Sequence, residues 1–105
     1  MKDYWKEKLT PFDYELCKMV ANLTGRECEP KNGDINYFFE ADYRDHDEPE
    51  YILAIWDAIV GRAGERLVDI HDDADRGRLF VRMAFANENP EQEFVPKHSD
   101  EIVSL

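Results

Sequence analysis

The sequence has few of the residues that several classes of protein depend on. It holds two cysteines, Cys17 and Cys28, among 105 residues. Two thiols are too few for the disulfide framework of a small secreted domain, and their spacing matches no zinc-binding pattern. The only serines are Ser99 and Ser104, and no G-x-S-x-G, phosphate-binding loop or dinucleotide fingerprint occurs. The sequence therefore favours a non-enzymatic protein that carries no cofactor.

Long apolar runs and clusters of basic residues are also scarce. The longest apolar run covers residues 51–56, far short of the roughly 20 residues that a membrane-spanning helix needs. Residues 1–7 lack the apolar core of a signal peptide. No three basic residues are consecutive, and a formal net charge of −11 repels both nucleic-acid phosphate and anionic lipid. We therefore expect a cytoplasmic protein that binds neither nucleic acid directly nor a membrane.

Acidic and apolar residues, by contrast, are plentiful. The chain has 24 acidic residues against 13 basic ones, and 43% of its residues are hydrophobic. Such a length and composition are typical of one globular domain. We expect a single α+β domain over residues 1–105, with 1–9 and 87–105 peripheral or partly flexible. Within the second of these segments, residues 92–95 are a candidate edge strand and residues 99–105 a candidate last helical turn.

Local signals predict two helices. Thr10 can cap a helix, Pro11 suits the first helical position, and Gly25 can end the helix in a left-handed turn. Pro49 opens a second helix that ends at Gly64. The apolar residues of this second helix cover an arc of about 160° on a helical wheel, which predicts deep packing with the tryptophan in the core. They are Ile52, Leu53, Ile55, Trp56, Ile59, Val60 and Ala63.

Three segments, 35–43, 66–72 and 78–86, have the composition and alternation of strands. The face of the first strand that we expect to point inward consists of Ile35, Tyr37, Phe39, Ala41 and Tyr43. The last two strands should form a hairpin, with Val68 and Ile70 on the inward face and an even number of loop residues. The predicted fold is thus α+β in the order α-β-α-β-β. Both helices should cover one face of a three- or four-stranded mixed or antiparallel sheet.

An acidic stretch after the first strand is the leading candidate for function. A field of this sign steers a basic protein surface toward it, and desolvated aromatic rings supply most of the binding energy at an interface. The hypothesis is therefore a small non-enzymatic interaction protein that binds a basic protein partner. The candidate partner-binding residues are Asp42, Tyr43, Asp45, Asp47, Glu48, Glu50 and Tyr51. At the level of class alone, small size, acidity and mixed α/β order are similar to those of bacterial and phage accessory proteins such as toxin inhibitors and DNA mimics.

A second acidic cluster supports an alternative, a small metal-binding protein or metal-assisted enzyme. Its residues are Asp69, His71, Asp73 and Asp75, and one imidazole with nearby carboxylates is a plausible ligand set for a divalent metal. Asp69 and His71 share one face of their strand. The EF-hand pattern fails, because Gly77 stands fifth rather than sixth from Asp73. Asp-rich segments before a glycine are also common in ordinary hairpin turns.

A third hypothesis is a homodimeric structural domain. The second helix carries small residues, Ala54, Ala58 and Gly61, at a spacing that permits close approach of another element. An exposed sheet edge offers another route to the same assembly. The chain is therefore expected to be a monomer or a homodimer.

Overall fold

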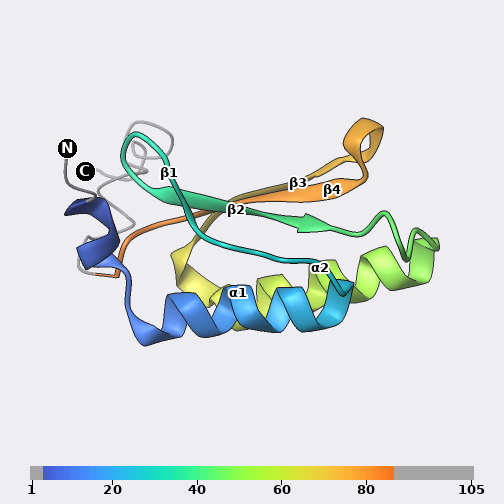
Figure 1. Ribbon diagram of the computed structural model, residues 1–105, viewed down its shortest axis with the longest axis horizontal. Coiled ribbons are helices and arrows are strands. Elements are labelled where there is room, and N and C mark those ends of the chain that lie inside the picture. Colours follow the sequence, from blue (N-terminus) through green and yellow to red (C-terminus); the bar gives the residue numbers. More distant parts are fainter. Residues whose placement is uncertain (1–3, 87–105) are drawn as a thin grey trace, which may run out of the picture.

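Two helices cover one face of a four-stranded antiparallel sheet (Figure 1). The computed structural model describes residues 4–86. The α+β fold class predicted from the sequence is confirmed, and the sheet has the upper of the two predicted strand numbers. The candidate strand at 92–95 and the candidate helical turn at 99–105 lie outside the described residues.

The helices begin and end where the local signals place them. A short 3-10 helix, η1 (Tyr4–Lys8), precedes α1 (Pro11–Thr24), and α2 spans Pro49–Ala63. At the start of α1, the Thr10 backbone N–H donates to Asp13 Oδ2 over 2.8 Å, which satisfies a group that the helix itself leaves unpaired. At its end, Gly25 adopts φ 77° and its N–H donates to the Ala21 carbonyl. No helix within residues 4–86 is long and apolar enough to cross a bilayer.

The four strands are β1 (Lys31–Asn32), β2 (Tyr37–Asp42), β3 (Leu67–Asp73) and β4 (Arg78–Met83), in the spatial order β1-β2-β4-β3. Because β2 and β3 both run antiparallel to β4, they run parallel to each other on either side of it. The β2-α2-β3 segment is thus a split β-α-β unit. β1 is not among the three strands predicted from the sequence, because two residues are too few to show any periodicity.

The hairpin between β3 and β4 confirms the predicted even loop. Asp73 pairs with Arg78, and the residues between them include η3 (Ala74–Arg76) and Gly77, which adopts φ 68°. Gly77 therefore occupies the left-handed region that glycine enters at no steric cost.

The inward face of β3 differs from the prediction. A bulge between Leu67 and Asp69 shifts the register, so that Leu67 pairs with Met83 on the inward face. Val68, predicted to share that face with Ile70, lies in the bulge. An extra residue of this kind leaves the alternation of the remaining strand intact, so the sequence pattern did not reveal it.

The core lies between the helices and the sheet. Its apolar side chains with no measurable exposure are Leu16, Val20, Tyr37, Phe39, Ala41, Ile59, Leu79, Val81, Met83 and Ala84. Two predictions of burial are corrected at its margins. Ile35 precedes β2 and is 56% exposed, and the arc of α2 is wider than the surface the fold covers. Leu53 and Val60 therefore remain exposed, and Trp56 packs at the edge of the core, only partly buried.

Candidate functional site

The two acidic segments meet at one end of the sheet. The β2–α2 connection and the β3–β4 hairpin lie together at the right of Figure 1, and Asp42 at the end of β2 pairs with Arg78 at the start of β4. We call this region, residues 42–50 and 69–78, the acidic end. Its two segments were predicted separately from the sequence, and the antiparallel pairing of β2 with β4 brings them together.

Tyr43 joins the two segments from inside. Its backbone N–H donates to the Gly77 carbonyl over 3.0 Å, and its hydroxyl donates to Asp72 Oδ1 over 2.6 Å. Burial, together with this hydrogen bond to the Asp72 carboxylate, raises the pKa of Tyr43 to about 12. The hydroxyl is therefore a neutral donor at physiological pH. Because the side chain is buried, Tyr43 positions the acidic end and leaves little of its ring on the surface.

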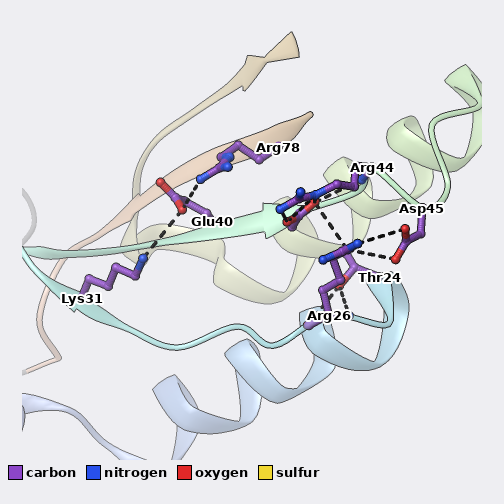
Figure 2. A network of polar contacts seen from close by, with 8 residues as sticks. Thr24, Arg26, Lys31, Glu40, Arg44, Asp45 and Arg78 are labelled. Atoms are coloured by element: carbon purple, nitrogen blue, oxygen red, sulfur yellow. Dashed lines mark hydrogen bonds and ion pairs between the residues drawn. The ribbon is translucent and has the colours of Figure 1, made fainter. Parts of the chain in front are cut away.

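Arginines offset part of the first acidic segment. Arg26 Nε donates to Asp45 Oδ2 over 2.9 Å (Figure 2). Arg44 Nη2 lies 2.7 Å from Asp42 Oδ2. The hydrogen bonds from Arg44 hold the pKa of Asp42 below its usual range. Asp42 and Asp45, both predicted to face a partner, are thus engaged within the chain.

Three other predicted residues of this segment have no such partner. Asp47, Glu48 and Glu50 are exposed, and no side chain among residues 4–86 makes an ion pair or hydrogen bond with them. The same holds for Asp75 in the hairpin. Glu48 and Glu50 stand at the first turn of α2, where the helix dipole favours acidic side chains. That local stabilisation leaves their charge directed to solvent.

Tyr51, the last predicted residue of this segment, contacts His46. The two ring centroids lie 4.6 Å apart, and Tyr51 is half-buried on the first turns of α2. The contact fixes the loop that carries Asp47 against the helix, so the exposed acids stand on a structured connection.

The residues of the metal alternative form a pair rather than a cluster. His71 Nδ1 lies 3.2 Å from Asp69 Oδ2, whereas Asp73 Oδ2 lies 3.7 Å from Arg76 Nη1. Asp75 is in η3 at the hairpin tip. Within residues 4–86, no group of three or more His, Cys, Asp or Glu side chains is arranged to hold a metal ion. The metal alternative therefore stays a prediction without support from the geometry.

The sheet face that turns away from the helices carries a row of rings. Phe80 stacks on Phe38 with centroids 5.0 Å apart and on His71 with centroids 5.3 Å apart. Beside them, Arg78 Nη1 lies 2.8 Å and Lys31 Nζ 3.8 Å from Glu40 Oε1 (Figure 2). The Glu40 carboxylate is thus balanced by two basic side chains on this face.

An apolar groove borders the acidic end, and sequence reasoning did not identify it. The groove lies between α2 and β3, has a volume of about 500 Å³, and is lined by Pro49, Ile52, Leu53, Trp56 and Asp72. Leu53 is 59% exposed. The available signal was the width of the apolar arc on the second helix, which exceeds what one sheet can cover. Because Asp72 also accepts the Tyr43 hydroxyl, the groove and the acidic end share a residue.

Cys28 does not supply an activated nucleophile. Cys17 and Cys28 lie together beside a groove of about 460 Å³. A hydrogen bond with the Cys17 thiol and, to a smaller extent, burial both raise the pKa of the Cys28 thiol. A thiol whose pKa is raised is protonated at neutral pH and is a poor nucleophile.

The three small residues of α2 do not form one open surface. Ala54 and Gly61 are exposed, whereas Ala58 is half-buried. The homodimer hypothesis based on them stays a prediction.

Comparison of the chain with protein-family models, with curated proteins and with solved structures finds no match. The functional proposal below therefore depends on the geometry and charge of the acidic end.

Proposed function

We propose that this chain is a non-enzymatic interaction protein whose acidic end binds a basic surface of a partner protein. The observation that carries the proposal is the convergence of two acidic segments at one end of the sheet. There, Asp47, Glu48, Glu50 and Asp75 have no basic side-chain partner within the described residues. Carboxylates without a basic partner project an uncompensated negative electrostatic field into the surrounding solvent.

The acidic end and the groove would contribute to binding in different ways. Exposed carboxylates accelerate association with a cationic surface, and their effect weakens as salt screens them. Leu53 and Trp56 offer apolar surface that a partner can remove from water, at about 25 cal/mol per Å² buried. The acids would therefore set the rate of encounter, and the groove would set the lifetime of the complex.

The experiment begins with capture of partners from a cell lysate on the immobilised protein, at low salt. Captured proteins are then purified, and their association rates are measured by surface plasmon resonance at increasing salt. The test variant combines Asp47→Asn, Glu48→Gln, Glu50→Gln and Asp75→Asn. The control removes the same number of exposed acids elsewhere, through Glu7→Gln, Glu15→Gln, Asp34→Asn and Glu65→Gln.

We expect basic partners whose association slows steeply with salt. The test variant should lose about tenfold in association rate, while the control loses less than about twofold, because field strength falls off within a Debye length of roughly 10 Å. Equal losses in both variants would show that only net charge matters. Salt-independent binding, or capture of acidic and basic proteins alike, would contradict the proposal.

A further inference from the structure

We propose that the partner presents an extended segment that adds to the sheet as a new strand along β3, with alternate side chains entering the groove beside α2. This inference rests on the proposed function, since it specifies which part of a basic partner is bound. It specifies the strand along which the partner segment pairs, which of its side chains enter the groove, and which sequence pattern the segment carries.

The first element of the site is the open edge of β3. β3 lies at the end of the strand order and, among the described residues, pairs with β4 alone. Alternate residues of an edge strand direct their backbone N–H and C=O groups away from the sheet, where they can pair with another chain. With the seven residues Leu67–Asp73, this edge is long enough to pair with a peptide strand.

The second element is the groove itself. It lies between β3 and the flank of α2, and its apolar wall is formed by Ile52, Leu53 and Trp56. Side chains of a strand point alternately to the two faces of its sheet. Every second side chain of an added strand would therefore point to the helix side and could bury apolar surface against this wall. Peptide recognition by strand addition combines backbone pairing and side-chain pockets in this way.

Charge defines the remaining positions of the ligand. On the sheet face away from the helices, Asp69 is exposed and has no arginine or lysine partner within residues 4–86. In the groove, Asp72 accepts one hydrogen bond through Oδ1, from Tyr43. Basic side chains on the outer face of the added strand would lie beside Asp69, and one at the end of the groove would reach Asp72. The fitting ligand thus alternates apolar and basic residues.

The same charges argue against two other occupants. In a dimer formed by two antiparallel β3 strands, Asp69, Asp72 and Asp73 of one copy would face like charges, which destabilises such pairs. The chain's own residues 87–105 contain a single lysine, Lys97, and are also acidic. Their acids are Glu88, Glu91, Glu93, Asp100 and Glu101. A basic partner segment is the occupant that the charge favours.

The test uses fluorescence anisotropy of labelled octapeptides with the full-length protein. The first peptide alternates leucine with lysine. The second has the same composition but places the four leucines before the four lysines, and the third is the alternating peptide with N-methylated backbone on every second residue. Two register choices of N-methylation are made, so that one of them blocks the N–H groups that face β3. Protein variants are Leu53→Lys in the groove and Ala54→Lys, which adds the same charge at an exposed neighbour outside it.

We expect the alternating peptide to bind at least tenfold more tightly than the block peptide. N-methylation in one register and Leu53→Lys should each weaken binding at least tenfold, whereas Ala54→Lys and the other register should change it less than about threefold. The free protein should sediment as a monomer, and the Leu53→Lys variant should keep its thermal transition because the site is exposed.

The outcomes separate this inference from the proposed function. Equal binding of alternating and block peptides, with strong salt dependence and no effect of Leu53→Lys, would overturn strand addition while leaving the acidic end as a binding surface. Absence of binding by both cationic peptides at low salt would overturn both. A free protein that sediments as a dimer and becomes a monomer with Leu53→Lys would assign the groove to a second copy and overturn the proposed occupant.

Discussion

The two ends of the sheet hold carboxylates in opposite situations. At the end where β2 begins, Asp13 is fully buried and is held by Arg66, whose Nη2 lies 2.7 Å from Asp13 Oδ1. Tyr37 donates its hydroxyl to the same oxygen over 2.5 Å. At the acidic end, Asp47 and Glu50 are exposed and have no such partners within residues 4–86. The net charge of the chain therefore combines two kinds of carboxylate, one buried and structural and one exposed to solvent.

Burial explains why the Asp13 carboxylate has both a cationic partner and several hydrogen-bond donors. Moving an ionised carboxylate out of water costs roughly several kcal/mol of hydration free energy. Only nearby opposite charges and hydrogen bonds offset that cost. Thr10 supplies a backbone N–H as well, and Arg66 also donates to the Ala84 carbonyl. Asp13 thus ties α1 to β2 and to the residues that flank β3 and β4. The acids at the other end have kept their hydration, which a partner would have to displace.

The largest expected difference in stability between the two ends appears when one carboxylate is removed from each. Asp13→Ala should lower the free energy of unfolding by about 3–5 kcal/mol, because it leaves the partly buried Arg66 charge without its partner. Asp47→Ala should change it by less than about 0.5 kcal/mol, as exposed substitutions usually do. Urea unfolding followed by tryptophan fluorescence measures both. Similar losses for the two variants would show that Asp13 is not the structural carboxylate.

A smaller effect on the free energy of unfolding is expected when the tyrosine that donates to a carboxylate at each end is replaced. Tyr37→Phe removes a donor from a buried carboxylate and should cost about 1.5–3 kcal/mol. Tyr43→Phe removes a donor from Asp72, which is exposed and can accept from water instead, so about 1 kcal/mol or less is expected. The same urea titration ranks them, and the reverse order would contradict the assignment of the two ends.

Alkaline pH should weaken the hydrogen bonds that these two tyrosines donate. Burial and the Asp13 carboxylate raise the pKa of Tyr37, and burial with Asp72 raises the pKa of Tyr43 to about 12. The folded protein therefore favours the neutral hydroxyls. Their contribution to stability is intact below the unfolded tyrosine pKa of about 10 and is lost as pH rises from there toward the folded pKa.

Ultraviolet absorbance of tyrosinate tests this expectation. Tyr43→Phe should remove the step near pH 12. A Tyr43→Phe variant that loses tyrosinate absorbance near pH 10, and not near pH 12, would show that the Asp72 contact does not form in solution.

Most of the local structure was predictable because its signals are local. Pro11 and Gly25 bound α1, and Pro49 and Gly64 bound α2, each within one residue of the structure. Alternation also assigned Tyr37, Phe39, Ala41 and Tyr43 to the buried face of β2. Such features depend on a residue and its near neighbours, so the sequence carries them directly.

The features that were missed depend on distant residues. The sequence gives Asp13 no signal beyond that of an acid suited to a helix start, because Tyr37 and Arg66 reach it only through the fold. The engagement of Asp45 by Arg26 has the same origin. On α2, the apolar arc was visible, but only the packed structure decides that Leu53 is left in a groove. The candidate site was therefore predictable as a charge pattern and not as a surface.

The smallest expected effect sharpens the comparison at the acidic end itself. Arg26→Gln frees the Asp45 carboxylate, whose exposed ion pair should contribute only about 0–1 kcal/mol to stability. Lys18→Gln removes the same charge from an exposed position on α1. Because Arg26 pairs with a carboxylate of the acidic end, its removal should speed association of the alternating leucine–lysine peptide about twofold at low salt, measured by stopped-flow anisotropy. The Lys18→Gln rate should stay nearer that of the wild type, and the difference should vanish at high salt as the field is screened. Equal acceleration by both variants would mean that the peptide responds to net charge, in which case the position of the carboxylates at this end of the sheet has no part in recognition.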